Sequence, residues 1–380
     1  MSVRTHTFII LFSLALIIQG AFADSIAVRN LTIADLPPCT LQCMIPLIPT
    51  SGCAPDDQRC VCSNDKLTTD LSNCLLANCT MADIQNTSRV QADLCNLPHE
   101  SSQKEMFWVL LVTYVLIALS VVLRIVGKYV AKRPSLDDLV LFIAFLLQAV
   151  PMGCTFTMIH LGLGLHLWDL QDGRLIPIIR LFYIAAIVYI AVLGVLKASV
   201  VLFYIEIFHT PRFRNIAYTV LAFIAVNTLV LCFVTIFTCD PVPRFWNRDI
   251  KGKCMDVSGI GLAVGISAIV QDAILLALPI TFIRSLNISG LKKLAVGGLL
   301  SIGAFGCIAT ALRLKANPNF KQSLDPSWNY GEGMIWTDLE ALSIYVCISL
   351  PSIRMLFVSI MPDRVKKMFS RLTQKRSAND

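Results

Sequence analysis

The sequence predicts an all-α membrane protein, in which a small disulfide-rich helical head precedes a bundle of seven transmembrane helices. Hydrophobic residues make up 56% of the 380 residues and charged residues only 15%, whereas a soluble protein carries roughly 25% charged residues. Eight of the fourteen cysteines lie between residues 39 and 95. From residue 106 onward, apolar runs of about twenty residues, each long enough to cross a bilayer, alternate with short charged loops.

Charge divides the chain into two parts of different character. Residues 24–104 hold nine acidic and five basic residues, whereas residues 105–380 hold sixteen acidic and 26 basic residues. The mean hydropathy of +0.68 excludes an ordinary cytosolic enzyme and an intrinsically disordered chain. Membrane lipid is therefore an expected partner of the larger part, and nucleic acid is not.

The first 23 residues have the three parts of a secretory signal peptide. Arg4 is followed by an apolar run from Phe8 to Ile18 and by the exit sequence Ala21-Phe22-Ala23. The apolar run is too short to cross a bilayer core of roughly 30 Å as a helix. We expect cleavage after Ala23, which places residues 24–104 in an oxidising compartment. A retained signal anchor is the alternative.

The cysteines of the head form an even and dense set. A domain this small cannot build a deep core, so disulfides would supply the missing stability. Eight cysteines allow roughly a hundred pairings, and the sequence does not choose among them. A zinc site is the alternative, but Cys60-Val61-Cys62 is tighter than the usual zinc spacing, and thiolates do not stay reduced outside the cell. We expect disulfides at Cys39, Cys43, Cys53, Cys60, Cys62, Cys74, Cys79 and Cys95.

Three N-glycosylation triplets support an extracellular head. They begin at Asn30, Asn78 and Asn86, and each ends in serine or threonine two residues later. Asn78 is the weakest of the three acceptors, because the neighbouring Cys79 is expected in a disulfide.

The order of the cysteines, with two prolines before the first, resembles that of the CFEM domain of fungal surface proteins. The resemblance covers roughly residues 30–98. It implies a small helical domain and, in some members, haem bound on a flat apolar platform. By this resemblance Asp57, three residues before Cys60, corresponds to the axial ligand of the haem iron, and a hard carboxylate would favour ferric iron. The alternative is that Asp57 caps a helix or turn.

Residues 105–361 are predicted to contain seven transmembrane helices, because lipid offers no partner for unsatisfied backbone groups. The spans are Met106–Val126, Leu139–Ile159, Ile178–Ile207, Ile216–Thr238, Ser258–Ile283, Leu294–Leu312 and Ile335–Ile360. Residues 362–380 form a basic cytosolic tail, for which an amphipathic helix on the membrane and a disordered segment remain open.

Loop charge predicts the orientation of the bundle. With the head outside, the inner loops and tail carry roughly twice as many basic residues as the outer loops, in agreement with the positive-inside rule and the signal peptide. We therefore expect a multi-pass plasma-membrane protein with an extracellular head. Cys239 and Cys254 then lie in one outer loop and can form a disulfide. His160 and His166, at the outer end of the second span, are interpreted as solvated loop residues, with a metal or pH role as the alternative.

Several loop and helix-end sequences resemble the fungal rhodopsin-like integral membrane family. They include Pro134-Ser135-Leu136-Asp137-Asp138, Gly162-Leu163-Gly164-Leu165-His166, Lys197-Ala198-Ser199, Cys239-Asp240-Pro241 and Asp325-Pro326-Ser327-Trp328. With the CFEM head, this resemblance implies a receptor-like surface sensor of the class called CFEM-type G-protein-coupled receptors, linked in pathogens to infection structures. The chain departs from the family at Glu206, where members commonly carry a basic residue near the cytosolic end of the third span.

Among the ionisable residues of the predicted spans, we single out Lys197, Asp272, Asp338 and Glu340. An unpaired charge in a bilayer is costly, so such residues are functional candidates. We expect Lys197 to pair with Asp272 or Glu340 in the bundle interior. Whether the pair acts as a switch or only fixes the helix register stays open.

Two functions of different classes agree with these features. The first is a receptor whose head samples an unknown extracellular ligand and whose bundle signals to a cytosolic partner such as a G protein. The second is a surface protein that captures haem or iron for nutrient acquisition. We find no internal repeats, which argues against a transporter. We also find no zinc motif, nucleophile elbow or phosphate loop, so no enzymatic activity is expected. A retinal pump is not expected either, because the seventh span contains no lysine.

Overall fold

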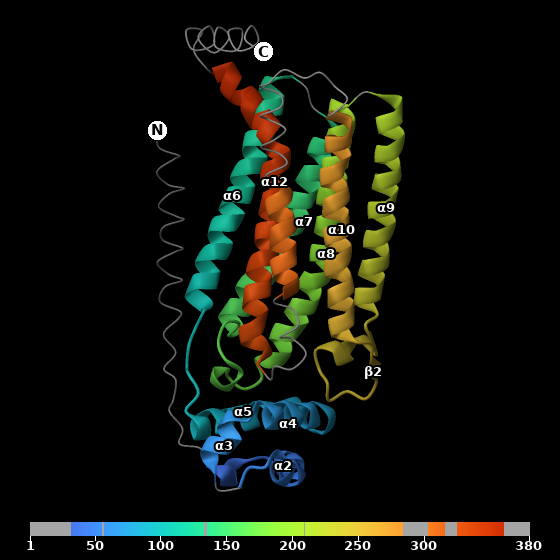
Figure 1. The fold of residues 1–380 in the computed structure, drawn as a ribbon. Helices are drawn as coiled ribbons and strands as arrows, with labels where there is room; N and C mark the ends of the chain where they lie inside the picture. Colours follow the sequence, from blue (N-terminus) through green and yellow to red (C-terminus); the bar gives the residue numbers. More distant parts are fainter. Residues whose placement is uncertain are drawn as a thin grey trace, which may run out of the picture.

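A computed structural model describes residues 32–54, 57–132, 135–208, 210–283, 303–315 and 325–360. Most of these residues are helical, which confirms the all-α fold class. The helices form two units (Figure 1): a small head, drawn in blue, lies across one end of a bundle of long helices. We call this end of the bundle the head end and the opposite end the far end. The predicted signal peptide and basic tail lie outside the described residues.

The head is built from short helices whose boundaries follow from local capping. They are the 3-10 helix η2 (Ile33–Asp35) and the α-helices α2 (Pro38–Ser51), α3 (Gln58–Ser63), α4 (Asp65–Asn78) and α5 (Met81–Cys95). Pro38 opens α2, where its missing N–H costs no helical hydrogen bond, and Gly52 ends it with a φ of 78°. Thr80 and Asp83 form a reciprocal capping box at the start of α5.

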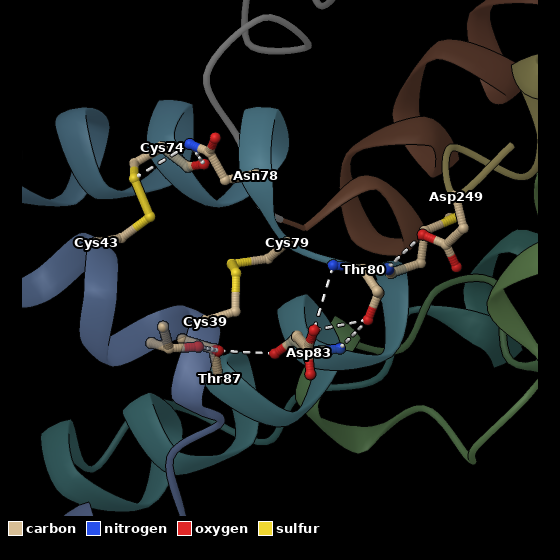
Figure 2. The surroundings of a disulfide bond; sticks show 11 residues. Cys39, Cys43, Cys74, Asn78, Cys79, Thr80, Asp83, Thr87 and Asp249 are labelled. Atoms are coloured by element: carbon tan, nitrogen blue, oxygen red, sulfur yellow. Dashed lines mark hydrogen bonds between the residues drawn. A yellow bond between two sulfur atoms is a disulfide. The ribbon is translucent and has the colours of Figure 1, made fainter. Parts of the chain in front are cut away.

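All eight head cysteines are paired, which confirms the predicted disulfide framework. Cys39–Cys79 and Cys43–Cys74 join α2 to α4 (Figure 2). Cys53–Cys60 closes the loop before α3, and Cys62–Cys95 joins α3 to the end of α5. Every α-helix of the head is therefore crosslinked to another, which compensates for the small apolar core.

Six described helices of the bundle are long and apolar enough to cross a membrane. They are α6 (Gln103–Val130), α7 (Leu136–Leu161), α8 (Leu175–Ile207), α9 (Pro211–Ile236), α10 (Val257–Ile283) and α12 (Pro326–Ile360). A further helix at residues 303–315 overlaps the second half of the predicted sixth span, whose first half lies outside the described residues. Six of the seven predicted spans thus coincide with complete described helices, and the sixth span stays a prediction over residues 294–302.

Helix α12 begins well before the predicted start at Ile335. A hydropathy pattern detects only the apolar part of a helix, whereas local capping determines the residue at which the helix begins. Here the carboxylate of Asp325 accepts the backbone N–H of Trp328 at 3.3 Å. The polar first turns then pack closely on α6, since a Cβ added at Gly331 would lie 2.8 Å from the sulfur of Met106.

The interior and the outer surface of the bundle differ in the way a bilayer requires. Helix α8 lies in the centre and buries residues along its whole length. Helices α6 and α12 approach closely at Gly127, where a Cβ would overlap the carbonyl group of Ser352. Large apolar side chains are exposed on the outer faces, among them Leu119, Leu146, Leu229 and Phe233. Such a surface is stable in lipid and not in water.

The head end of the bundle carries two structured loops. The loop between α7 and α8 contains the 3-10 helix η3 (Leu167–Asp169). The loop between α9 and α10 contains the 3-10 helix η4 (Val242–Phe245) and two short antiparallel strands, β1 (Cys239–Asp240) and β2 (Lys253–Cys254). The expected disulfide Cys239–Cys254 joins these strands.

Candidate functional site

The head is seated on the loops that connect the bundle helices. Helix α5 lies against the loop between α7 and α8, where Gln85 Nε2 donates to the carbonyl oxygen of Leu170 at 2.7 Å. Arg89 donates to the same oxygen at 2.5 Å and forms an ion pair with Asp172 at 2.6 Å. These contacts hold α5 on the segment that leads directly into α8.

Contacts from other parts of the head complete this junction. His99 Nδ1 lies 2.7 Å from Asp169 Oδ1. Asp249, in the loop between α9 and α10, accepts the backbone N–H of Met81 at 3.1 Å (Figure 2). A buried apolar cluster continues from the head into the α7–α8 loop and includes Leu75, Met81, Ile84, Leu163 and Leu167. Head and bundle therefore share a core at their junction.

The prediction that His166 is a solvated loop residue is wrong. Its ring is buried and stacked between Trp168 and Trp328, with ring centroids 4.3 and 4.2 Å away. Its Nδ1 lies 2.6 Å from Asp325 Oδ2. Trp328 and Asp325 come from the start of α12, so the sequence around His166 gives no sign of this packing. The contact ties the α7–α8 loop to α12.

A buried ion pair joins α8 to α10 in the bundle interior. Lys197 Nζ lies 2.9 Å from Asp272 Oδ1 and donates to the carbonyl oxygen of Ala268 at 3.0 Å. Thr310, on the helix at residues 303–315, donates to the other carboxylate oxygen at 3.3 Å. Of the two partners that the sequence left open for Lys197, the structure brings Asp272 into contact.

Glu340 belongs to a second polar group, with Tyr189 and Arg313. Tyr189 Oη donates to Glu340 Oε2 at 2.8 Å, and Arg313 Nη2 lies 3.7 Å from the same oxygen. Arg313 also donates to Tyr189 Oη at 3.3 Å and lies over the tyrosine ring. Sequence reasoning missed both partners. Arg313 directly follows the predicted sixth span, so extending that span by one turn would have included it, whereas no sequence signal marks Tyr189.

The remaining predicted intramembrane acid, Asp338, has a neutral partner. Gln148 Nε2 lies 3.4 Å from Asp338 Oδ1. A separate neutral contact joins α10 to α9, where Gln271 Nε2 donates to Asn227 Oδ1 at 3.0 Å. The four predicted residues therefore do not form one cluster. They are divided among an α8–α10 pair, an α12–α8 group and an α12–α7 contact.

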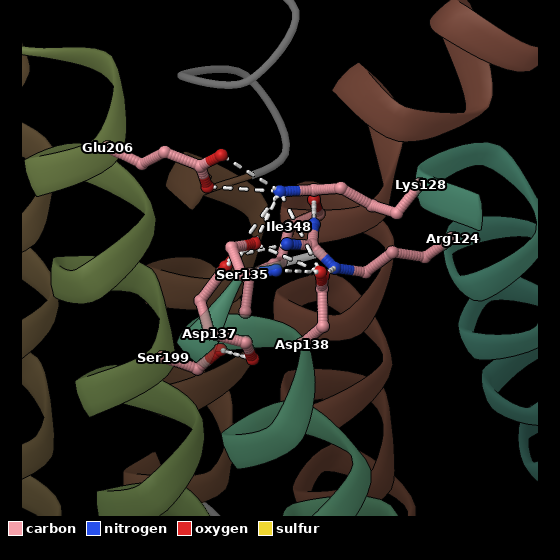
Figure 3. A network of polar contacts seen from close by, with 8 residues as sticks. All are labelled: Arg124, Lys128, Ser135, Asp137, Asp138, Ser199, Glu206 and Ile348. Atoms are coloured by element: carbon pink, nitrogen blue, oxygen red, sulfur yellow. Dashed lines mark hydrogen bonds and ion pairs between the residues drawn. The ribbon is translucent and has the colours of Figure 1, made fainter. Parts of the chain in front are cut away.

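Arg124 forms the centre of a charge cluster at the far end, which sequence reasoning missed (Figure 3). Its guanidinium, fully buried, forms an ion pair with Asp137 and donates to the carbonyl oxygen of Ile348. Its Nε lies 2.8 Å from Asp138 Oδ1. One arginine thus joins α6, α7 and α12. It escapes a hydropathy pattern because a single charge hardly lowers the mean of an apolar run.

Glu206, where a basic residue is common in the family, contacts a neighbouring lysine in the same cluster. Lys128 Nζ lies 3.0 Å from Glu206 Oε2 and 2.6 Å from Ser135 Oγ (Figure 3). The Glu206 side chain is 41% exposed, whereas that of Lys128 is 6% exposed. The acid therefore connects the end of α8 to α6 at the far-end surface.

Asp57 lies at the start of α3 in the head. Its Oδ1 accepts the backbone N–H of Cys60 at 3.1 Å, so the carboxylate caps this helix. The residue is exposed and can still be reached by a ligand from outside. The described residues contain no group of three histidine, cysteine, aspartate or glutamate side chains that could hold a metal ion. A single axial contact to a haem iron is compatible with this geometry.

The predicted glycosylation acceptors fall into two classes. Asn78 and Asn86 are exposed, on α4 and α5. The Asn78 side chain donates to the carbonyl oxygen of Cys74 at 3.0 Å. Asn30 lies outside the described residues.

Curated relatives of the chain are fungal. A SAT4 family membrane protein of Emericella nidulans is 25% identical over 222 residues, which cover 57% of this chain and 56% of that protein. Fugralins biosynthesis cluster protein 2 of Gibberella zeae is 21% identical over 300 residues, covering 76% and 75%. Receptor GIN3 of Arthrobotrys oligospora is 22% identical over 187 residues, covering 48% and 44%. The chain thus spans about half the length of the first and third of these relatives. No solved structure matches the chain.

Family comparison assigns both parts of the chain. Residues 32–96 match the CFEM domain, which is the head. Residues 123–359 match the fungal rhodopsin domain, which takes up more than half of the chain. Both resemblances read from the sequence are confirmed. The chain belongs to the family of fungal rhodopsin-like membrane proteins and carries a CFEM domain as its head.

Proposed function

We propose that this protein is a plasma-membrane receptor whose extracellular head changes the arrangement of the bundle when it meets a cue. One observation supports this most directly: α8 connects the junction with the head to the interior and to the far end. The helix follows the loop that holds α5, carries Tyr189 and Lys197 in the interior, and carries Glu206 near its last residue at the far end. A displacement of the head would therefore act on a single helix that reaches the opposite end.

The polar contacts along α8 suit a change between discrete arrangements. Hydrogen bonds and ion pairs in a low-dielectric interior are either made or broken, so packed elements shift between distinct states and do not deform continuously. The far end carries the Lys128–Glu206 contact at its surface, where a cytosolic partner such as a G protein would bind. The relative named Receptor GIN3 supports a receptor role. The loop charges and signal peptide support an extracellular head.

Loosening the junction should alter the far end even without a known ligand. In the Gln85→Ala/Arg89→Ala variant, α5 loses its side-chain hydrogen bonds to Leu170 and its ion pair with Asp172 in the α7–α8 loop, and keeps the apolar contacts. We expect backbone amide hydrogen exchange to rise several-fold in this loop and also in the far-end residues around Asp137 and Glu206. The measurement is hydrogen–deuterium exchange with mass spectrometry on the full chain in nanodiscs.

A matched control separates this effect from a general loss of stability. Arg59→Ala removes an exposed arginine from α3, whose side chain forms no hydrogen bond or ion pair with the described residues of the bundle. It should leave exchange in both regions unchanged. Faster exchange at the junction with no change at the far end would contradict this relay, in which α8 transmits a displacement of the head to the far end.

The second candidate is capture of haem or iron by the head, and the exposed carboxylate of Asp57 favours it. Ferric haem should then bind the full chain in detergent saturably, with a shift of the Soret band. The variants Asp57→Ala and Asp57→Asn should both lose this binding. Asparagine keeps the cap on α3, because it is as good an N-cap residue as aspartate, but it removes the anionic ligand.

The asparagine variant makes this test specific for iron coordination. Alanine also removes the cap, at a cost of about 0.5–2 kcal/mol, so a loss seen only with alanine would indicate a structural effect. Asp65→Asn, an exposed acid at the start of α4, serves as the matched control. Equal affinity in the wild type and Asp57→Asn would remove Asp57 as the ligand, and absence of saturable binding would remove this function.

A further inference from the structure

The bundle contains a partly open cavity of about 220 Å³ near the head end. It lies among α7, α8, α9, α10, α12 and the helix at residues 303–315, and most of its wall is apolar. Representative lining residues are Phe182, Ile190, Val264, Leu314, Tyr330 and Met334. Sites for drug-sized ligands measure roughly 300–1,000 Å³. The cavity therefore suits a smaller molecule with an apolar body.

Polar atoms that lack hydrogen-bond partners face or adjoin this apolar space. Thr235 and Arg313 line the cavity, and Thr235 Oγ1 and Arg313 Nη2 are buried with no hydrogen-bond partner among the described residues. Asp338 also lines it and is 8% exposed. Pockets that bind small molecules combine an apolar wall with a few such groups, which orient the ligand.

The balance of charge in the interior singles out Asp338. Among the interior residues that the structure describes, Lys197 is paired with Asp272 and Arg313 with Glu340, which leaves Asp338 as the acid in excess. In the part of the chain that the structure describes, no ion pair within 4.0 Å involves Asp338. Asp338 instead contacts the amide of Gln148, whose Nε2 lies 3.4 Å from Asp338 Oδ1. An unpaired carboxylate in such surroundings is costly, and a cation placed beside it would remove that cost.

We propose that this cavity binds a small amphipathic molecule with an apolar, aromatic or aliphatic body and a protonated amine, whose ammonium group pairs with Asp338. A carboxylic acid fits less well, because it would add a second negative charge in excess. The charge of Arg313, the cation that could hold it, is already balanced by the carboxylate of Glu340. The rings of Phe182 and Tyr330, stacked at 4.5 Å in the wall, suit a flat apolar body.

The position of the cavity connects such a ligand to the junction and to α8. Thr238 and Phe245, in and beside the loop that contacts the head through Asp249, line the cavity. Tyr189 of α8 lines it too and donates to Glu340. The statement that this ligand is the cue of the receptor rests on the function proposed above. The statement that the cavity binds it depends only on the cavity and its charges.

Matched sets of small molecules test the head group directly. Phenylbutylamine, phenylbutanoic acid and phenylbutanol share one apolar body, and hexylamine, hexanoic acid and hexanol share another. Each is titrated against the full chain in nanodiscs by isothermal calorimetry. We expect at least one amine to bind at least tenfold more tightly than its matched acid and alcohol. Asp338→Asn should remove that tenfold advantage and leave the affinity for the alcohol unchanged.

A folding check on the test variant and one control variant keep the result interpretable. Asp338→Asn preserves the shape of the side chain and a contact with Gln148, and thermal unfolding shows whether the variant is folded. Glu332→Gln removes an exposed carboxylate from the same helix, outside the cavity, and should not alter amine binding.

The proposal is overturned if no amine binds more tightly than its matched acid and alcohol, or if Asp338→Asn binds the amine as well as the wild type does. The exchange experiment on the junction needs no ligand. Failure of the amine site therefore leaves the receptor function open, and failure of the relay leaves the amine site open.

Discussion

Replacing Arg124 with methionine should destabilise the folded protein by about 3–5 kcal/mol, the usual cost of removing one partner from a buried ion pair. Methionine fills similar volume, so loss of packing contributes little. The cost arises because Asp137, which is 2% exposed, keeps its charge and loses the guanidinium. The carbonyl oxygen of Ile348 loses a donor as well. The free energy of unfolding can be measured by denaturant titration in mixed micelles.

Lys128→Met provides the comparison within the same cluster. It also removes a cation from the far end of α6, but its nearest carboxylate, that of Glu206, is 41% exposed and can be hydrated once the lysine is gone. Asp137 and Asp138 lie farther from Lys128 Nζ, at 3.9 and 3.8 Å, and keep Arg124 as their partner. We expect a loss of about 1 kcal/mol, as for partly exposed ion pairs. Equal losses in the two variants, or a larger loss for Lys128→Met, would show that Arg124 does not hold the far end together.

The fold could be predicted largely from the sequence because a bilayer leaves few choices for the backbone. An apolar run of sufficient length must form a helix in lipid, so spans such as Leu139–Ile159 coincide with described helices such as α7. The ends of the helices were less predictable. The start of α12 depends on Asp325 and on a close contact with Met106, and neither contributes to hydropathy.

Disulfide pairing shows where the sequence stops being informative. Cys39 and Cys43 are four residues apart and lie on one face of α2, which sequence spacing can indicate. Their partners depend on which helix lies beside that face and in which direction it runs. The pairs Cys39–Cys79 and Cys43–Cys74 connect the two helices in reversed order, as antiparallel packing of α2 on α4 requires.

The charged residues show the same limit. A charge in an apolar run marks Lys197, Asp272, Asp338 and Glu340 as candidates, but their partners follow from tertiary packing. Arg124 and Arg313 were missed because one charge at or near the end of a span hardly changes its hydropathy. Asp338 was predicted as an equal member of the set. Only the pairing of the other charges distinguishes it as the acid in excess.

Lys197→Met should destabilise the protein by about 3–5 kcal/mol, because it leaves the Asp272 carboxylate buried without its cation. A second substitution, Asp272→Asn, should restore most of this loss, since it removes the uncompensated charge and keeps an oxygen for the hydroxyl of Thr310. The matched control is Lys197→Met with Asp338→Asn, which removes an acid that does not contact Lys197 and should restore little. Unfolding free energies of the three variants are compared in the same micelles.

Exchanging the two charges tests whether the pair does more than fix the register of α8 on α10. In the Lys197→Asp/Asp272→Lys variant the ion pair can re-form, but the donation from Lys197 to the carbonyl oxygen of Ala268 and the hydrogen bond from Thr310 are lost. We expect stability between that of Lys197→Met and the wild type. Rescue by Asp338→Asn as large as that by Asp272→Asn would contradict the pairing. The junction substitutions Gln85→Ala and Arg89→Ala are then added to the exchanged variant. If the exchanged variant is stable but these substitutions no longer alter hydrogen exchange at the far end, the orientation of the ion pair matters for signal transmission. An ion pair of either orientation would then maintain the fold, but only the native one would transmit the displacement of α8.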